Sequence, residues 1–214
     1  MPSNPPPTGE RHTVPPPLPL PNDDPMAAFA AWFAHAEASG VPLPEAVALA
    51  TATWDGRPSA RMVLLKGADA DGLSFYTNFE SRKAAELDAN PRAAFCFHWA
   101  TLERQVRFGG TVERLGPEAS AAYFQSRPRG SRLGAWASLQ SRPLAARGEL
   151  EERLIEMEAR FRGRKVPLPP FWGGYRLVPL EVEFWLGRDD RLHDRVRFTR
   201  PDPADGWQAE RLYP

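Results

Sequence analysis

Residues 92–115 read RAAFCFHWATLERQVRFGGTVERL, and this stretch decides the fold class of the 214-residue chain. Arg92–Trp99 has the apolar and aromatic composition of a β-strand, and Arg104–Leu115 predicts a second, longer strand. The short connection at Ala100–Glu103 makes the pair a hairpin, because parallel strands need a much longer crossover. Within the second strand, Gly109-Gly110 predicts a bulge or a sharp bend.

Other predicted elements extend this pattern in both directions along the chain. Strands are predicted at Ala46–Thr53, Ser59–Lys66, Leu73–Thr77, Glu181–Leu186, Arg191–Thr199 and Trp207–Leu212. Helices are predicted from a cap at Asn22, Asp23 or Asp24 as far as Gly40, and at Ser81–Leu87, Pro117–Gln125, Ser131–Ser138 and Leu144–Phe161. Because the strands come as hairpins, we expect a mainly β fold with flanking helices, an antiparallel sheet or barrel rather than a doubly wound parallel sheet.

The N-terminus has a different composition from the rest of the chain. Ten of the 24 prolines fall within residues 1–25. A proline-rich segment of low hydrophobicity buries too little surface to offset the entropy of ordering it. We therefore predict a flexible arm over residues 1–21 and a single domain over residues 22–214. A ligand for another domain, or a lid that orders over a bound molecule, are the alternatives for the arm.

Charge and cysteine content exclude several functional classes. Lys plus Arg and Asp plus Glu each number 27, so the formal net charge is zero, which argues against a protein that binds nucleic acid through bulk charge. A single cysteine, Cys96, excludes an internal disulfide framework and a multi-cysteine zinc site, and it favours a reducing, cytoplasmic location. The chain contains no apolar run of about 20 residues and no secretory signal pattern, so we expect no membrane partner.

Two segments place cations where an anion could bind. In RMVLLK, Arg61 and Lys66 stand at opposite ends of an apolar strand and could bind an anion there. For this segment alone, the better interpretation is that both charged side chains extend into solvent. In FYTNFESRK, Arg82 and Lys83 follow Ser81, the predicted cap of a helix. Cations in a first turn oppose the helix dipole, so a phosphate bound there would explain them.

Two further segments carry polar groups that suit ligand recognition. The amide of Gln105 can act as donor and acceptor at the edge of a heterocycle, although in isolation an ordinary exposed strand residue explains it better. Ser126–Ser141, SRPRGSRLGAWASLQS, combines three arginines with several serines and two glycines. Bidentate arginines and hydroxyl donors suit phosphate capture, and RNA binding would use the same residue types.

The sequence RLHDR gives the best physical indication of a site. In a strand that begins at Arg191, the side chains of Arg191, His193 and Arg195 would share one face, with Leu192 and Asp194 on the other. A strand face made of two arginines and a histidine is not explained by packing alone. A neutral imidazole between two guanidinium groups could accept a proton or a hydrogen bond from a ligand.

From Ala46 to Pro214, the chain resembles the pyridoxamine 5′-phosphate oxidase family. The motifs that carry the resemblance are RMVLLK, FYTN with SRK, LERQVR, SRPR with S and GAW, PLPPFWGGYR, EFW with G, and RLHDR. The resemblance implies an FMN-binding split β-barrel of antiparallel, Greek-key type, which works as a homodimer with FMN at the subunit interface. It implies oxidation of pyridoxamine or pyridoxine 5′-phosphate to pyridoxal 5′-phosphate. Hydride would pass from C4′ to flavin N5, and O2 would reoxidise the flavin and give H2O2.

The resemblance also implies two sets of ligand residues and no metal. FMN contacts fall on Arg61, Met62, Val63, Leu64, Leu65, Lys66, Tyr76, Thr77, Arg82, Lys83, Gln105, Gln140, Ser141, Trp185 and Arg195. Substrate contacts fall on Lys66, Tyr123, Arg127, Ser131, Arg191, Leu192 and His193. Arg191, His193 and Arg195 are the predicted catalytic residues: the first two orient the substrate, and Arg195 stabilises the reduced flavin at its N1–O2 edge.

Three alternatives accompany this interpretation. A related flavin oxidase of the phenazine type is the nearest enzymatic one, and a non-enzymatic protein that binds flavin or pyridoxal phosphate would form no peroxide. RNA binding through the arginine-rich segment is disfavoured by the zero net charge. The sequence departs from the family at Gly130 and Arg132, at Leu186, and near Arg11 and His12, where the family often carries an Arg-Arg-x-Tyr stretch.

Overall fold

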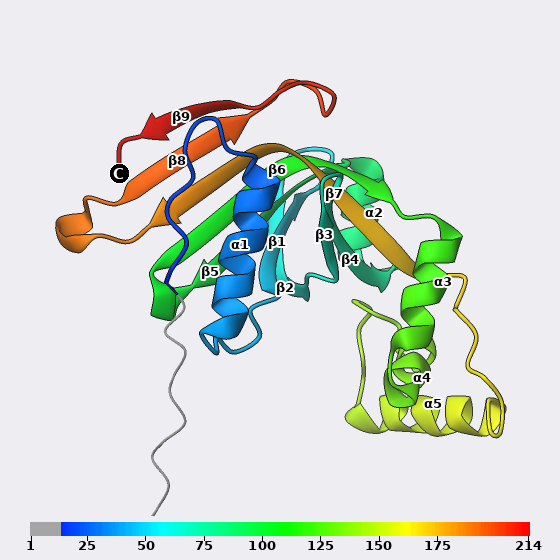
Figure 1. The fold of residues 1–214 in the computed structure, drawn as a ribbon. Coiled ribbons are helices and arrows are strands. Elements are labelled where there is room, and N and C mark those ends of the chain that lie inside the picture. Colours follow the sequence, from blue (N-terminus) through cyan, green and yellow to red (C-terminus); the bar gives the residue numbers. More distant parts are fainter. Residues whose placement is uncertain (1–13) are drawn as a thin grey trace, which may run out of the picture.

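The computed structural model describes residues 14–214, and residues 1–13 lie outside the described part. Its strands curl into a half-barrel with helices on the outside (Figure 1). The strands are β1 Ala46–Ala52, β2 Pro58–Leu64, β3 Gly67–Asp69, β4 Gly72–Asn78, β5 Arg92–Trp99, β6 Arg104–Arg114, β7 Trp172–Leu186, β8 Asp194–Thr199 and β9 Gln208–Leu212. The helices are α1 Pro25–Ala38, α2 Arg82–Ala89, α3 Pro117–Ser126, α4 Arg129–Ala137 and α5 Arg147–Arg160, with short 3-10 turns at Ala100–Leu102 and Asp189–Arg191.

One sheet contains all nine of these strands, and every pair in it is antiparallel. The order is β2-β1-β5-β6-β7-β4-β3, with β8 on β7 and β9 on β8. The long strand β7 pairs with β6 along one edge. Along its other edge it pairs first with β4, through Leu177, and then with β8, from Glu181. The sheet therefore divides at the middle of β7, where the partner strand changes from β4 to β8.

The bulge predicted in β6 is confirmed where β6 crosses this division. The register between β6 and β7 shifts between Gly109 and Gly110. A Cβ atom on Gly110 would lie 2.0 Å from the carbonyl oxygen of Val178, so only glycine fits there. The strand predicted at Glu181–Leu186 is in fact longer, because β7 begins at Trp172. The short strand β3 was not predicted, and it pairs with β4 through a tight turn between Asp69 and Gly72.

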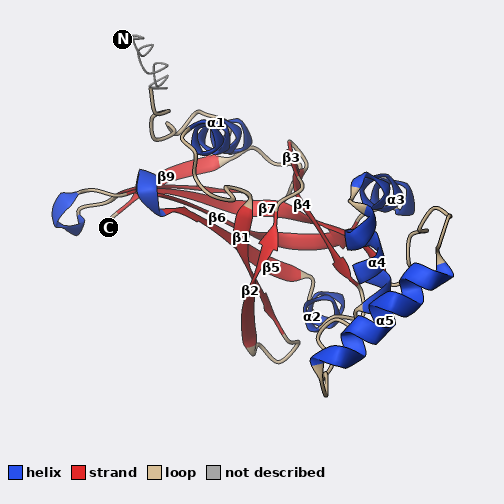
Figure 2. Ribbon diagram, turned by 90° about the horizontal axis from the view of Figure 1, so that it is seen from below, coloured by secondary structure: helices blue, strands red, loops and turns tan. Residues whose placement is uncertain are grey.

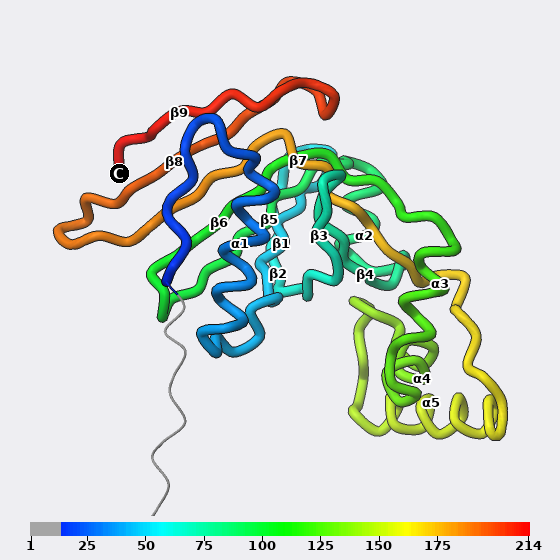
Figure 3. The backbone as a smooth tube through the Cα atoms, viewed as in Figure 1, coloured from blue at the N-terminus to red at the C-terminus, as the bar shows by residue number. Residues whose placement is uncertain are grey.

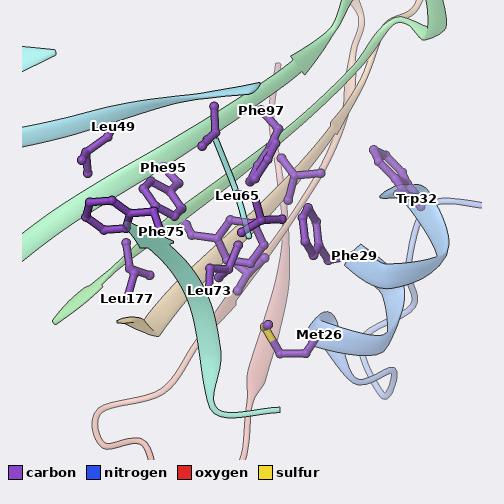
Figure 4. Close-up of a cluster of buried hydrophobic side chains, with 14 of the residues drawn as sticks. Met26, Phe29, Trp32, Leu49, Leu65, Leu73, Phe75, Phe95, Phe97 and Leu177 are labelled. Carbon is purple, nitrogen blue, oxygen red and sulfur yellow. The ribbon is translucent and has the colours of Figure 1, made fainter. Parts of the chain in front are cut away.

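The main core lies between the sheet and α1, which covers it. Asp24, one of the three caps that the sequence allows, caps this helix by accepting a hydrogen bond from the Met26 backbone N–H at 2.9 Å. Figure 4 shows α1 directing Met26, Phe29 and Trp32 toward aromatic and leucine side chains of the sheet. The ring of Phe29 lies 5.1 Å from that of Phe97 and 4.9 Å from that of Phe108. Burial of such rings is the main stabilising contribution to this half of the fold.

Residues 16–19 contact this domain, although the sequence predicted a free arm as far as residue 21. The indole N–H of Trp32 donates to the carbonyl oxygen of Pro17 at 2.9 Å, and Arg104 donates to that of Pro16 at 2.7 Å. The Arg104 guanidinium also lies over the Trp32 ring, 4.3 Å from its centroid, and Leu18 packs against the core. Two backbone carbonyls and one apolar side chain are therefore held in place.

A second, smaller core joins α3, α4 and α5 to the start of β7. It comprises Phe124, Leu133, Ala137, Met157, Phe161, Val166 and Trp172. Figure 2 shows these three helices together at one end of the sheet. Figure 3 shows the hairpin between β7 and β8, and the C-terminus, at the opposite end. Among residues 14–214, no helix has the length and apolar character needed to cross a bilayer.

Candidate functional site

A cavity of about 530 Å³ opens at the helical end of the sheet. Its walls come from β2, from β4, and from helices α2, α3 and α4 with the loop that follows α4. Twelve predicted ligand residues line it: Arg61, Met62, Val63, Leu64, Lys66, Tyr76, Thr77, Lys83, Tyr123, Arg127, Ser131 and Gln140. Residues from three separate segments of the sequence, RMVLLK, FYTNFESRK and Ser126–Ser141, are thus brought together around one space.

One corner of the cavity is built around the ammonium group of Lys83. This group donates to the hydroxyl of Thr77 at 3.1 Å and to the amide oxygen of Gln140 at 3.0 Å. Burial, together with the nearby charge of Arg61, lowers the pKa of Lys83 to about 8. An anion bound beside this ammonium group would reverse that effect, because opposite charges favour the charged form. The corner therefore fits a phosphate.

A buried carboxylate behind the cavity holds Arg61 in place. Glu86 is only 4% exposed and receives hydrogen bonds from two hydroxyls and two arginines, namely Thr51, Ser59, Arg61 and Arg82. Burial alone would raise the pKa of Glu86, but these hydrogen bonds outweigh it and lower the pKa to about 2. The carboxylate therefore stays ionised, and Arg61 presents its charge from a fixed position.

Arg82 does not line the cavity, although the sequence predicted an FMN contact there. Its Nε atom donates to Glu86 at 2.8 Å, one helical turn along α2. An (i, i+4) ion pair therefore accounts for this cation in the first turn without a bound phosphate. Lys83 is the residue of this pair that reaches the cavity.

A second cationic corner lies at the start of α4. The Arg127 guanidinium sits 4.8 Å from the centroid of the Trp172 ring, and its buried Nη1 atom has no hydrogen-bond partner among the described residues. Burial lowers the pKa of Arg127. Ser131 lies in the first turn of α4, and no side chain caps this helix at Pro128. Free N–H groups, a hydroxyl and an unpartnered guanidinium nitrogen together suit a second anion.

Aromatic rings form the wall between the two corners. The rings of Tyr76 and Tyr123 stack 4.0 Å apart, and Trp172 lies nearly parallel to Tyr76 at 5.6 Å. Trp172 lines the cavity but was not among the predicted ligands, and neither were Asn78, Gly134, Ala135 and Ser138. Trp172 belongs to the PLPPFWGGYR motif, so the sequence did contain a signal for it.

Two predicted ligands lie close to the cavity without lining it. Leu65 is buried, with 6% of its surface exposed, and it packs into the main core. Ser141 follows Gln140 and lines a neighbouring cavity of about 190 Å³. Among residues 14–214, no group of three or more His, Cys, Asp or Glu side chains is placed to hold a metal ion.

The remaining predicted ligands gather at the opposite end of the sheet, near the β7–β8 hairpin. Gln105 pairs with Trp185 across β6 and β7, and Trp185 pairs with Arg195 across β7 and β8. Arg195 donates to the buried carboxylate of Glu183 from Nε at 3.0 Å, and to the carbonyl oxygen of Tyr213 at 3.0 Å. None of these side chains lines the cavity of its own chain.

The strand face predicted for Arg191, His193 and Arg195 is wrong. Arg191 ends a 3-10 turn and has a φ of 61°, and β8 begins only at Asp194. His193 nevertheless comes to the same cluster, because the turn places its ring 4.5 Å from that of Trp185. Its Nδ1 atom accepts a hydrogen bond from the Arg188 backbone N–H at 3.1 Å. A tight turn, and not strand alternation, therefore positions these residues.

Comparison with known proteins identifies the family. Residues 33–160 match the family model described as pyridoxamine 5′-phosphate oxidase. Residues 172–214 match the model of the pyridoxine 5′-phosphate oxidase C-terminal dimerisation region, which supports a homodimer.

Individual relatives agree with the family models. Pyridoxine/pyridoxamine 5′-phosphate oxidase of Rubrobacter xylanophilus is 58% identical over 191 residues, which cover 89% of this chain and 87% of that protein. The protein of the same name from Salinibacter ruber is 55% identical over 193 residues, covering 90% of each chain.

Solved structures confirm the predicted split-barrel fold. PhzG of Burkholderia lata, crystallised with tetrahydrophenazine-1-carboxylic acid, superposes with a TM-score of 0.85 at 34% identity, covering 91% of this chain and 94% of its own. A pyridoxamine 5′-phosphate oxidase-related, FMN-binding protein of Nostoc punctiforme has a TM-score of 0.71 at 21% identity, covering 90% of this chain and all of its own, and so supports the fold alone. By sequence and by fold, the chain belongs to the pyridoxamine 5′-phosphate oxidase family.

Proposed function

We propose that this protein is an FMN-dependent oxidase of pyridoxamine and pyridoxine 5′-phosphates that produces pyridoxal 5′-phosphate. The observation that carries the proposal is the pair of cationic corners in one cavity, around Lys83 and around Arg127. The reaction brings together two phosphorylated molecules, the cofactor and the substrate. Relatives more than 50% identical over nearly the whole chain carry the name of this activity.

The Lys83 corner is the proposed site of the FMN phosphate, and the Arg127 corner is the proposed site of the substrate phosphate. Lys83 has a lowered pKa of about 8 and hydrogen bonds only to neutral groups, so an anion would gain a charge-assisted contact there. Arg127 has a buried nitrogen without a partner among the described residues, which a phosphate oxygen would satisfy. When bound between these corners, FMN would supply the acceptor, at N5, for hydride from C4′ of the substrate, and O2 would serve as the final oxidant and give H2O2.

We also propose that a second copy of the chain completes each site. Gln105, Trp185, His193 and Arg195 do not line the cavity of their own chain. They belong to the start of β6 and to the hairpin of β7 and β8, and Figure 3 shows that hairpin at the end of the sheet opposite α3, α4 and α5. Apart from Gln105, these residues fall within the segment that matches the dimerisation region. In the proposed homodimer, the hairpin end of one copy faces the cavity of the other, and FMN lies between them.

At the hairpin end, we assign positioning roles to the side chains. His193 accepts a hydrogen bond at Nδ1, so a neutral imidazole carries its proton on Nε2 and presents a donor. This geometry favours a residue that orients the substrate over one that removes a proton. Arg191 shares that orienting role, and Arg195 supplies positive charge for the N1–O2 edge of the reduced flavin.

An anaerobic reduction experiment tests the proposal. The full-length protein is loaded with FMN, mixed with pyridoxamine 5′-phosphate without oxygen, and then exposed to air. We expect the flavin absorption to bleach and return, with formation of pyridoxal 5′-phosphate, ammonia and H2O2. A protein that takes up no FMN would overturn the whole proposal, and one that binds FMN but never bleaches with either phosphate would overturn the assigned substrate.

The same assay separates the alternatives. The phenazine type has one observation behind it, the structural match to PhzG, but identity there is only 34%. Bleaching by tetrahydrophenazine-1-carboxylic acid, and by neither pyridoxamine nor pyridoxine 5′-phosphate, would establish that alternative. Flavin or pyridoxal phosphate that binds tightly and is never reduced would establish a non-enzymatic protein. The cytoplasmic location and the absence of nucleic-acid binding stay predictions.

A further inference from the structure

Glu183 is a buried carboxylate at the hairpin end that carries none of the roles assigned above. It lies in the second half of β7 and is 2% exposed. Its Oε1 atom accepts from Nε and Nη2 of Arg195, at 3.0 and 2.9 Å, and its Oε2 atom accepts from Arg107 on β6. A buried carboxylate is retained only when its charge is compensated, and here two guanidinium groups compensate it.

The register of the strands shows that this contact to Arg195 is selective. The residue directly opposite Glu183 on β8 is Arg197, and Arg195 is opposite Trp185. Arg197 is engaged instead by Glu210, which its Nε and Nη2 atoms contact at 3.1 and 2.5 Å. Glu183 therefore reaches diagonally along the sheet to Arg195, although an arginine stands directly across from it.

Arg195 is consequently held on two sides. Glu183 accepts from its Nε and Nη2 atoms, while its Nη1 atom donates to the Tyr213 carbonyl oxygen. These contacts fix the plane of the guanidinium group. They also place a negative charge against the cation, which reduces the positive field that Arg195 exerts on anything bound beyond it.

We infer that Glu183 is a positioning residue that sets the orientation and the effective charge of Arg195 toward the flavin, and so tunes how easily the flavin is reduced. The inference rests on the proposed function, in which Arg195 faces the N1–O2 edge. Reduction, and likewise addition of an anion at N5, places negative charge at that edge. Loss of the Glu183 charge should make both processes more favourable.

Sulfite binding and the flavin midpoint potential test this inference in the FMN-loaded protein. Glu183→Gln keeps the shape of the side chain and removes its charge. We expect the sulfite dissociation constant to fall by about tenfold and the midpoint potential to become more positive, with FMN still bound. The matched control is Glu181→Gln on the same strand face, which should leave both quantities unchanged. Equal shifts in the two variants would contradict the inference.

A double-mutant cycle shows whether Glu183 acts through Arg195. In an Arg195→Gln background, Glu183→Gln should produce no further change in sulfite affinity. The same shift in both backgrounds would overturn the positioning role. If Glu183→Gln does not fold, Arg107→Gln provides the second test. In this variant, Glu183 keeps Arg195 as its ion-pair partner and loses Arg107, so its negative charge acts more strongly on Arg195. Sulfite affinity should then fall. An unchanged or increased affinity would refute the inference.

Failure of this inference is distinguishable from failure of the proposed function. A wild-type protein that binds no FMN contradicts the proposed function and is detected before any variant is made. A wild-type protein that binds FMN and oxidises pyridoxamine 5′-phosphate, combined with unaltered sulfite affinity in Glu183→Gln, contradicts only the role of Glu183.

Discussion

Each end of the sheet holds a buried carboxylate that binds two arginines, but the two carboxylates differ in the other donors around them. At the cavity end, Glu86 binds Arg61 and Arg82 and also accepts from two hydroxyls, so one chain satisfies the whole group. At the hairpin end, Glu183 has only arginine partners, and Arg195 is still a quarter exposed. The carboxylate of the cavity end is therefore satisfied by four donors of two kinds, whereas the carboxylate of the hairpin end depends on two arginines alone, so a change in either arginine alters its charge balance more.

Neutralising Glu86 should have the largest effect on stability, because it removes the buried charge that pairs with Arg61 and Arg82. We expect Glu86→Gln to lower the free energy of unfolding by about 3–5 kcal/mol, as for a broken buried ion pair. Chemical denaturation measures this value. The matched control is Glu80→Gln, since Glu80 forms only a surface ion pair with Arg142 and should matter little. Equal losses in the two variants would contradict the role of Glu86.

The stability of the wild-type protein should also depend on pH through Glu86. Its pKa falls from 4.5 in the unfolded chain to about 2 in the folded one. The stabilising contribution is therefore complete above pH 4.5 and is lost as pH falls from there toward 2. Glu86→Gln should remove this part of the pH dependence, and an unchanged acid profile would show that other carboxyl groups produce it.

Truncating the substrate-facing residues of the hairpin should give the next largest effect. Arg191→Ala and His193→Ala should each reduce turnover about 100-fold through loss of orientation, while FMN stays bound. Steady-state kinetics and flavin fluorescence measure the two quantities. Arg188→Ala is the control in the same turn, because its backbone N–H, and not its side chain, holds His193. Loss of FMN with retained substrate affinity would reverse the assignment.

Removing the cation of the cavity end should weaken FMN binding without affecting the fold. Lys83→Ala loses a charge-assisted phosphate contact worth roughly 1.5–3 kcal/mol, which corresponds to about a ten- to hundredfold larger FMN dissociation constant. Fluorescence titration of the apoprotein measures it. Lys165→Ala, an exposed lysine outside the cavity, should leave the constant unchanged. An unaltered constant in Lys83→Ala would place the FMN phosphate elsewhere.

The smallest effect concerns the pH dependence of the same contact. The pKa of Lys83 is about 8 in the unliganded protein, and a bound phosphate should raise it. FMN affinity should therefore be full below pH 8 and should weaken as pH rises above 8, by at most about tenfold per pH unit. Titrations between pH 7 and 10 measure this slope, which Lys83→Ala should abolish. A flat wild-type profile would exclude a titrating lysine from the site.

The sequence predicted most of the fold because its strands and caps carry local signals. β5 agrees residue for residue, Asp24 and Ser81 cap the helices expected of them, and the double glycine marks the bulge. The first half of β7 was missed because Pro179 and the Gly173-Gly174 pair disfavour a strand in isolation. Pairing with β4 and β6 overrides those local preferences.

The residues that line the cavity could be predicted from the sequence more fully than the buried ion pairs behind them. Twelve of the predicted ligands line it, because the family motifs specify residues that touch ligands. Glu86 and Glu183 were not singled out, since a carboxylate acquires its role only when distant arginines fold onto it. At RLHDR, the prediction that alternate side chains of a strand share one face was wrong. Asp190 and Arg191 adopt positive φ values there, which the residue pattern of a strand does not predict.

The length of β7 determines whether two different variants of the chain can complement each other in a mixed dimer. From Trp172 beside the cavity to Trp185 at the hairpin, the strand rises 13 times by about 3.3 Å, so the two ends stand up to about 43 Å apart. In the proposed dimer, a chain damaged at Lys83 and a chain damaged at His193 would therefore complement each other. Random pairing of two such impaired proteins would restore about one site in four, since each mixed dimer contains one undamaged site.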